Sequence, residues 1–252
     1  QRKKRGAAMS NNCLYIIIPA YNEEANIRNV IHDWYPIVDK IGTDSRLLIV
    51  DDGSKDHTYS IIQSEIDTHP QLEVVTKENG GHGSSILFGY KKALSASADY
   101  IFQTDSDGQT CADEFWDFWD ARDSYDIQIG SRCNREDGFS RVVVTKTLKA
   151  AVRLFFHVSI EDANTPFRLM SAASLRNIID LVPKDYFLTN VLLSVIYTKK
   201  AASMRFLPIT FRPRQGGVNS INIPRIVGIG LQSVKDFIHL NRRIDAVLGK
   251  RK

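Results

Sequence analysis

The first half of the chain alternates short apolar runs with amphipathic stretches, and this alternation constrains the fold more than any other feature. Helical patterns, for example over residues 23–39 and 83–97, separate apolar runs that predict strands. The five predicted strands begin at Leu14, Arg46, Leu72, Tyr100 and Tyr125. Such βαβ alternation predicts an α/β fold, with a mostly parallel, twisted sheet and helices on both faces.

The length and the composition indicate one domain. A chain of 252 residues that is 43% hydrophobic can bury one substantial core. The three cysteines, Cys13, Cys111 and Cys133, are odd in number and lack a C-x-x-C spacing. Cysteine spacing therefore predicts neither a zinc site nor a disulfide framework, and a reducing cytoplasm is expected.

The charges are unevenly distributed along the chain. Four basic residues lie in residues 1–9, which we expect to be a leader or a cloning remnant. Without them 29 basic and 29 acidic residues balance, so no nucleic-acid partner is expected. Residues 10–126 hold 21 acidic and 8 basic residues, whereas residues 127–252 hold 8 acidic and 21 basic ones. An acidic half suits a metal or a sugar, and a basic half suits phosphate groups or an anionic membrane.

Polar clusters follow the first four predicted strands. They are "PAYNEE" (19–24), "DDGSKDHT" (51–58), "NGGHGSS" (79–85) and "DSDGQ" (105–109). Each alone is typical of a turn or a helix cap, but in a parallel sheet all four would meet at one edge, where ligands bind. Two carboxylates as close as Asp105 and Asp107 are costly unless a cation neutralises them. No G-K-[ST] ending or G-x-G-x-x-G fingerprint is present, so the sequence does not favour a P-loop or dinucleotide site.

These segments together resemble a known family. "IIIPAYNEEANI", "LIVDDGSKDHT", "NGGHGSSILFGYKKA", "TDSDGQ" and "DANTPFRLM" are similar to glycosyltransferase family 2, most closely its dolichyl- and polyprenyl-phosphate sugar synthase branch. The similarity runs from about Tyr15 to Ser220. It implies a Rossmann-like GT-A domain over residues 10–222, followed by an amphipathic helical tail over 223–252. Within the domain, residues 10–130 would form the nucleotide-sugar half and 131–222 the acceptor half.

The resemblance also implies a donor site. A UDP- or GDP-sugar would bind there with Mg²⁺ or Mn²⁺, which neutralises the leaving pyrophosphate. By motif position, Asp107 and Gln109 would hold the metal, while Asp105 and Ser106 would contact the nucleotide and its sugar. The residues implied to contact the base and the ribose are Pro19, Tyr21, Glu23, Val50 and Asp52.

Basic residues of the second half are implied to hold phosphates. Arg132 and Arg141 would bind the acceptor phosphate, and Arg168 would brace the site beside Phe167. In "FRPRQGGVNSIN" (211–222), Arg214 would meet the pyrophosphate of the donor. Ser220 is also expected to contact the substrate, although Asn219-Ser220 stands where the synthases favour a Ser-Lys pair.

Two functions remain open from the sequence. The leading hypothesis is an inverting, metal-dependent glycosyltransferase that acts on a polyprenyl (dolichyl or undecaprenyl) phosphate, with Asp107 and Arg132 as catalytic residues. The alternative is a family 2 enzyme in which Asp162 acts as base toward a sugar hydroxyl of a glycan or glycolipid. A non-catalytic sugar-nucleotide-binding protein is disfavoured by the presence of the metal ligands. A nucleotidyltransferase is disfavoured because "PAYNEE" is acidic.

Two basic amphipathic stretches raise the question of a membrane. They cover Arg141–His157 and Pro224–Lys252, and no run reaches the roughly 18 to 20 apolar residues of a membrane span. We expect a peripheral protein on the cytoplasmic face of a membrane, held by its own surface or by a membrane-anchoring partner protein. An ordinary surface helix, a partner-docking helix and truncation before transmembrane segments remain alternatives.

Overall fold

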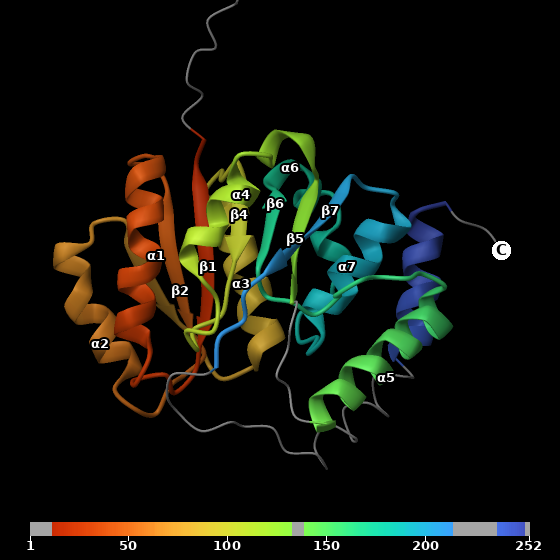
Figure 1. Cartoon of the computed structure of the whole chain (residues 1–252), viewed down its shortest axis with the longest axis horizontal. Coiled ribbons are helices and arrows are strands. Elements are labelled where there is room, and N and C mark those ends of the chain that lie inside the picture. Colours follow the sequence, from red (N-terminus) through yellow and green to blue (C-terminus); the bar gives the residue numbers. More distant parts are fainter. Residues whose placement is uncertain (1–11, 133–138, 214–235, 250–252) are drawn as a thin grey trace, which may run out of the picture.

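The computed structural model describes residues 12–132, 139–213 and 236–249, with the side chains of 139–145 left aside. Its sheet has seven strands in the order β3-β2-β1-β4-β6-β5-β7 (Figure 1). The strands are β1 (Leu14–Ala20), β2 (Arg46–Asp51), β3 (Leu72–Thr76), β4 (Tyr100–Gln103), β5 (Ile127–Arg132), β6 (Arg168–Ser171) and β7 (Met204–Ile209).

Helices connect these strands. The α-helices are α1 (Ile27–Ile41), α2 (Thr58–Glu65), α3 (His82–Ser95), α4 (Phe115–Trp119), α5 (Phe139–Phe156), α6 (Ala172–Arg176) and α7 (Thr189–Lys199). Short 3₁₀ turns are η1 (Ile66–Thr68), η2 (Ala112–Glu114), η3 (Arg122–Ser124) and η4 (Ile179–Leu181).

The sheet is mostly parallel, as the alternation predicts. β1 pairs in parallel with both β2 and β4, and β2 pairs in parallel with β3. β6 is antiparallel to its neighbours β4 and β5, while β7 is parallel to β5. The five predicted strands are confirmed, although the fifth begins at Ile127 rather than at Tyr125. β6 and β7 were not predicted.

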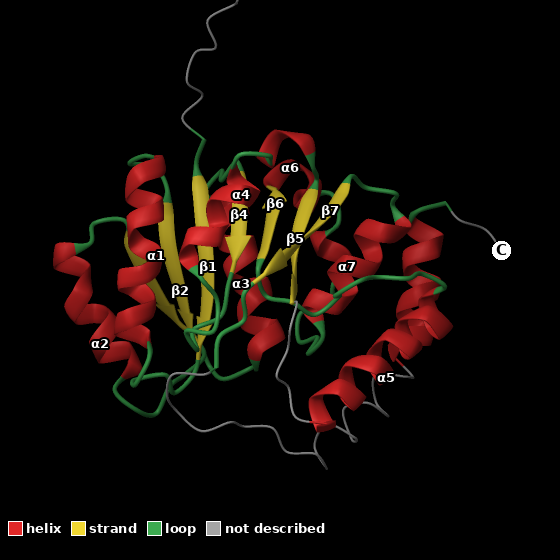
Figure 2. Cartoon of the chain, viewed as in Figure 1, coloured by secondary structure: helices red, strands yellow, loops and turns green. Residues whose placement is uncertain are grey.

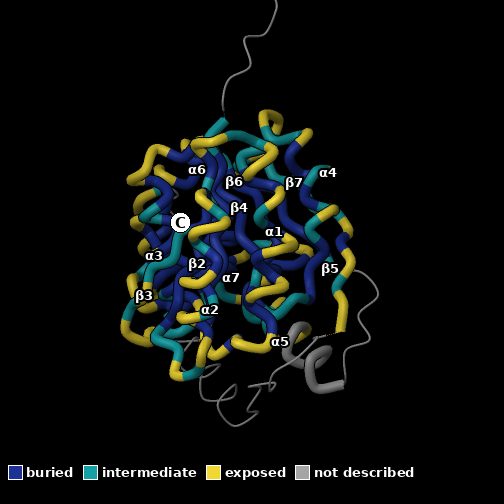
Figure 3. Tube along the Cα trace, turned by 90° about the vertical axis from the view of Figure 1, so that its left-hand side faces the viewer, coloured by how far each residue is buried: buried dark blue, intermediate teal, exposed yellow. Residues whose placement is uncertain are grey.

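The central strand β1 is buried on both faces because its side chains alternate between two apolar layers. Buried residues, dark blue in Figure 3, fill the interior of the molecule around the sheet. Leu14 and Ile16 belong to the cluster that includes buried residues of α1, α2 and α4. Tyr15 and Ile17 belong to the opposite cluster, with buried residues of α3, α5 and α7. Helices therefore cover both faces of the sheet (Figure 2), which confirms the predicted arrangement.

Helix α1 shows how the sequence pattern becomes packing. Within the predicted helical pattern of residues 23–39, the apolar residues Ile27, Val30, Ile31 and Trp34 share one face of the helix and are buried. The Trp34 ring lies 5.3 Å from that of Phe102 in β4, so α1 packs directly over the centre of the sheet.

The described part of the predicted tail is a helix over residues 236–247. Its apolar residues Phe237, Leu240 and Ile244 are buried in the cluster that also holds residues of α5 and α7. The Phe237 ring lies 5.0 Å from that of Phe156 in α5. Residues 223–235 and 250–252 lie outside the described residues. No helix in the described part of the chain is long and apolar enough to cross a membrane.

Gly83 provides a test of how closely α3 approaches the loop before α7. A Cβ at this position would collide with the carbonyl oxygen of Tyr186 and lie 2.7 Å from that of Phe187. Because backbone carbonyls cannot move away cheaply, we expect Gly83→Ala to lower the free energy of unfolding by about 1–3 kcal/mol. Urea denaturation measures this change. The exposed Ser95→Ala, in the same helix, is the control and should stay close to the native protein; equal stability of both variants would contradict the packing described.

Candidate functional site

The carboxyl ends of β1, β2, β3 and β4 meet at one edge of the sheet, the lower edge in Figure 1. The loops after β1 and β2 are joined by hydrogen bonds between main chain and side chain. The Glu23 amide donates to Thr58 Oγ1 (2.8 Å), and the Asn22 amide donates to Ser54 Oγ (3.0 Å). Asn22 adopts a left-handed backbone, with φ of 55°. The two predicted base and ribose loops therefore form one unit.

The residues predicted to contact the base and the ribose lie together in this unit. Pro19 and Val50 are paired across the neighbouring strands β1 and β2. Tyr21 is 42% exposed, so its ring is available to a ligand, whereas Glu23 and Asp52 are buried. The structure thus brings all five residues to the same end of the sheet.

Asp52 organises the loop that leads into α3. Its carboxylate accepts hydrogen bonds from the Gly81 amide (2.7 Å) and the Gly80 amide (3.0 Å), and it pairs with Lys77. Burial alone would raise the pKa of Asp52, but the hydrogen bonds from Lys77, Gly80, Ser85 and Gly81 outweigh it and lower the pKa. Asp52 is therefore a charged, well-satisfied anchor of the NGGHG segment in addition to its predicted place beside the base.

His82, the first residue of α3, contacts the acidic motif. Its Nε2 lies 2.9 Å from Asp105 Oδ1, and both side chains are partly exposed. Desolvation alone would lower the pKa of His82, but the carboxylates of Asp105 and Asp107 raise it. His82 lies in the NGGHGSS motif, but no role was predicted for it from the sequence. Only the fold shows that α3 begins opposite the end of β4.

Asp107 and Gln109 lie in a tight turn after β4. The Gln109 amide donates to Asp107 Oδ1 (3.1 Å), and Gly108 between them has a φ of 71°, which favours glycine. Gln109 Nε2 donates to the Arg212 carbonyl oxygen (2.8 Å), and the Arg212 amide donates to the Gln109 carbonyl oxygen (2.7 Å). The turn is therefore fixed against the segment that follows β7.

The donor atoms of this turn fit a hard divalent cation. The side-chain nitrogen of Gln109 is held by Arg212, so the amide oxygen is the atom that a cation can take. The Asp107 carboxylate is partly exposed, and it acts electrostatically on His82 together with the Asp105 carboxylate. Carboxylate and amide oxygens are ligands that Mg²⁺ and Mn²⁺ accept. These donor atoms could therefore accept such a cation, and the assignment of Asp107 and Gln109 as its ligands stays a prediction.

Arg132 and Asp162 form a largely buried ion pair, which the sequence did not indicate. Arg132 Nε donates to Asp162 Oδ2 (2.8 Å), and Arg132 Nη2 donates to Asp162 Oδ1 (2.9 Å). The two side chains are only 10% and 11% exposed. The guanidinium also lies 5.5 Å from the centre of the Phe211 ring. Arg132, which was predicted to bind an acceptor phosphate, and Asp162, which was predicted to act as base toward a hydroxyl acceptor, are therefore hydrogen-bonded to each other.

Arg168 is fully buried and braces the backbone around the site. Its guanidinium donates to the carbonyl oxygens of Ala163, Thr165 and Asn190. Burial lowers the pKa of Arg168 from its usual value. These contacts match the predicted bracing role, and a contact between this side chain and a substrate remains a prediction.

Three predicted residues cannot be placed as side chains. Arg214 and Ser220 lie outside the described residues, and Arg141 lies in α5 where only the backbone is described. Their predicted phosphate contacts remain predictions. In the same region, Arg212 and Phe211 were not assigned a role from the sequence, although "FRPR" marks them as an arginine-rich segment.

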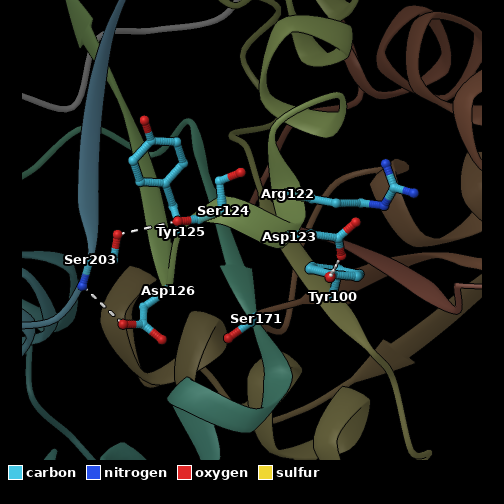
Figure 4. A pocket seen from close by; sticks show the side chains of 8 residues that line it. All are labelled: Tyr100, Arg122, Asp123, Ser124, Tyr125, Asp126, Ser171 and Ser203. Carbon is cyan, nitrogen blue, oxygen red and sulfur yellow. Dashed lines mark hydrogen bonds between the residues drawn. The ribbon is translucent and has the colours of Figure 1, made fainter. Parts of the chain in front are cut away.

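A polar hollow of about 220 Å³ lies at the opposite edge of the sheet (Figure 4). It is bordered by the first residues of β4 and the residues that precede β5. In it Tyr100 donates to Asp123 Oδ1, and burial together with this carboxylate raises the pKa of Tyr100 to about 12. Because the predicted donor residues lie at the other ends of the strands, this hollow is not their site.

Comparison with known proteins places this chain in a family. The sequence pattern of glycosyl transferase family 2 matches residues 15–177. A UDP-N-acetylglucosamine–dolichyl-phosphate N-acetylglucosaminyltransferase of Methanococcus voltae is 29% identical over 189 residues, which are 67% of this chain and 73% of that protein. An undecaprenyl-phosphate 4-deoxy-4-formamido-L-arabinose transferase of Pectobacterium atrosepticum is 29% identical over 58% of this chain. The match spans only 45% of that protein.

Solved structures share the fold. A glucosyl-3-phosphoglycerate synthase of Mycobacterium tuberculosis, solved with Mn²⁺, UDP-glucose and glycerol 3-phosphate, superposes with a TM-score of 0.65 at 18% identity. The match covers 91% of this chain and 80% of that one. Residues 1–349 of TarS from S. aureus, solved with UDP-GlcNAc, superpose with a TM-score of 0.60 at 17% identity, covering 94% of this chain and 71% of that one.

Proposed function

This chain belongs to glycosyl transferase family 2, and we propose that it transfers a sugar from a nucleotide sugar to a polyprenyl phosphate, with inversion at the anomeric carbon. The relatives named above act on dolichyl and undecaprenyl phosphates. The observation that carries the proposal is the Arg132–Asp162 ion pair. It lies at the end of β5, and β4 and β5 are both antiparallel to β6, so this end is on the same sheet edge as the acidic motif after β4.

The donor half supplies binding and orientation. The joined loops after β1 and β2 would hold the nucleotide, with Tyr21 against the base and Glu23 near the ribose. Asp107 and Gln109 would hold a divalent cation beside the diphosphate. When bound, this cation neutralises the negative charge that develops on the leaving nucleoside diphosphate. His82 holds the Asp105 carboxylate in place for contact with the donor.

The proposed chemistry is one displacement. An oxygen of the acceptor phosphate forms the new bond to the anomeric carbon, while the bond from that carbon to the diphosphate oxygen breaks. The nucleoside diphosphate leaves with the electron pair, and attack from the opposite side inverts the configuration. A phosphate monoester is already ionised near neutral pH, since its second pKa is about 6. The acceptor therefore needs positive charge around it rather than a base.

The ion pair favours this acceptor over a hydroxyl group. Both oxygens of Asp162 accept hydrogen bonds from Arg132, so the carboxylate would have to loosen a charge-assisted bond before it took a proton. Asp162 is better placed to orient the guanidinium of Arg132, which would then offer its outer N–H groups to a phosphate. In the alternative function, with a hydroxyl acceptor, Asp162 would act as the base from the same position at the sheet edge.

The acceptor can be tested directly with the native protein. We expect turnover with polyprenyl phosphate and almost none with the polyprenol of the same chain length, because only the former brings its own ionised nucleophile. Release of nucleoside diphosphate from a panel of UDP- and GDP-sugars with Mg²⁺ or Mn²⁺ present measures the rate. Comparable rates with the polyprenol would favour Asp162 as a base and overturn the proposal.

Variants of the pair sharpen that test. Asp162→Asn keeps the shape and should reduce kcat/KM for polyprenyl phosphate less than the factor of about 10² to 10⁴ that loss of a base would cause. The double variant Arg132→Ala/Asp162→Asn removes the charge of the arginine together with the opposite charge of the carboxylate that it pairs with, and it should reduce kcat/KM more strongly. Circular dichroism checks that both variants fold.

The metal ligands provide a further prediction. Asp107→Asn should remove most of the activity and weaken Mn²⁺ binding in the presence of the nucleoside diphosphate, because a neutral amide attracts the cation less. Asp117→Asn, an exposed residue of α4, is the matched control and should bind Mn²⁺ as the native protein does. Calorimetry reports binding independently of turnover. Unchanged Mn²⁺ affinity in Asp107→Asn would rule out its assignment as a ligand.

A basic surface supports peripheral contact with a membrane. Lys146, Lys149 and Arg153 of α5 are exposed, and Leu154 beside them is 66% exposed. Cations around an exposed apolar side chain are typical of a helix that lies on an anionic lipid surface. We therefore propose peripheral attachment through α5, on the cytoplasmic face of the membrane.

Liposome sedimentation tests this attachment. The protein should bind anionic vesicles at low salt and dissociate as salt rises, because screening weakens surface attraction. Lys146→Glu/Lys149→Glu should bind much less. Lys55→Glu/Lys200→Glu, which changes the net charge equally at two exposed sites elsewhere, should bind like the native protein. Equal loss in both double variants would show that net charge alone, rather than α5, determines binding.

A further inference from the structure

Three side chains that commonly bind transition metals meet between α1 and the end of α2, apart from the donor and acceptor residues discussed above. His32 lies in α1, Glu65 ends α2, and His69 follows η1. Their ligand atoms all lie within 4.8 Å of one another, and no other such trio occurs in the described part of the chain. We propose that His32, Glu65 and His69 bind a divalent transition-metal ion, with Zn²⁺ as the ion they suit best.

The distances fit a tetrahedral centre. His32 Nε2 lies 3.3 Å from Glu65 Oε2, and His69 Nδ1 lies 3.5 Å from the same oxygen. Around a tetrahedral zinc ion with bonds of about 2.0–2.1 Å, neighbouring ligand atoms lie roughly 3.3–3.4 Å apart. Both nitrogens are therefore already near the separation from Glu65 that a shared ion requires.

The carboxylate at the centre is almost buried. The Glu65 side chain is 7% exposed, and a buried carboxylate requires positive charge around it. Arg28 pairs with the other oxygen, Oε1, and leaves Oε2 facing the two imidazoles. Partners of this kind hold a ligating carboxylate in orientation in many metal sites. Arg28 thus fixes Glu65 without occupying the oxygen that the ion would take.

The two imidazoles are held by their neighbours. Their rings stack with centres 5.9 Å apart, and the Tyr35 ring packs edge-on against His69 at 4.5 Å. His69 Nδ1 also lies 2.9 Å from the Glu65 carbonyl oxygen and 3.0 Å from Thr68 Oγ1. Metal binding requires the tautomer with its proton on Nε2, so the hydrogen bond from Nδ1 to the Glu65 carbonyl breaks and the ring turns Nδ1 from that carbonyl toward Glu65 Oε2. The Glu65 carbonyl then keeps a donor, because Thr68 Oγ1 donates to it at 3.1 Å.

The ligand set selects the type of ion. Two imidazole nitrogens with one carboxylate suit Zn²⁺ and its transition-metal neighbours, whereas Mg²⁺ prefers oxygen ligands. The predicted cation site at Asp107 and Gln109 offers only oxygens, so the two sites would take different ions. The His32 side chain is 52% exposed, which leaves an approach for the ion and for water as a fourth ligand. The ion would join α1 to the α2–β3 connection as a structural clamp.

Calorimetry with zinc chloride tests the proposal on untagged, full-length protein in excess Mg²⁺. The native protein should bind one more Zn²⁺ than His32→Gln/His69→Gln. The single variant His32→Gln should weaken Zn²⁺ binding at this site by more than about 10- to 100-fold, which is the loss caused by removing a residue that only hydrogen-bonds to a metal ligand. His239→Gln is the matched control, because it removes an exposed histidine outside the cluster, and it should bind like the native protein.

Thermal unfolding provides the second measurement. Zn²⁺ should raise the Tm of the native protein and of His239→Gln but not that of His32→Gln, because an ion bound only to the folded state stabilises that state. His32 is half-exposed, so its replacement leaves the protein folded even if the double variant is not. Equal zinc stoichiometry and affinity in the native protein and His32→Gln would overturn the proposal. The trio would then be only an ion-pair network around Glu65.

Discussion

The parallel pairing of β1 between β2 and β4 is the constraint on which the rest of the structure depends. β1 places Leu14 and Ile16 in one apolar layer and Tyr15 and Ile17 in the other, so it cannot shift by one residue without exchanging both layers. With this register fixed, the residues after each strand arrive at one edge. The short loops at this edge carry the carboxylate and amide side chains of the site. These side chains lie close together because the strands pack in a fixed register in the core, away from the site.

Several charged groups are buried near that edge, and the protein stabilises each differently. Asp52 accepts from two loop amides and from Lys77. Arg132 and Asp162 neutralise one another, and Arg168 donates to backbone carbonyls. Because a buried charge without such partners is expensive, these contacts also hold the loops in fixed positions. The same interactions that satisfy the charges therefore organise the site before any ligand binds.

The sequence predicted what local patterns determine. The five strands, the helical pattern of α1 and the polar turns that follow the strands result from alternation, periodicity and turn chemistry over a few residues. β6 has four residues and begins with a buried arginine, and β7 is a half-exposed edge strand that contains Pro208, so neither shows a clear pattern. Contacts between distant residues, such as His82 with Asp105, require the fold. The Arg132–Asp162 pair joins residues 30 positions apart, and no local pattern indicates it.

This pairing changes how the two proposed acceptors are compared. In the sequence analysis, Arg132 supported a phosphate acceptor and Asp162 supported a hydroxyl acceptor, and the two residues were treated as independent. In the structure, removing either residue also breaks its ion pair with the other, and such a loss mixes a structural cost with any catalytic one. The chemistry of the acceptor itself carries no such ambiguity, since a phosphate and an alcohol differ in ionisation whatever the protein does. Comparing a phosphate acceptor with an alcohol acceptor therefore decides between the two functions more directly than substituting Arg132 or Asp162 does.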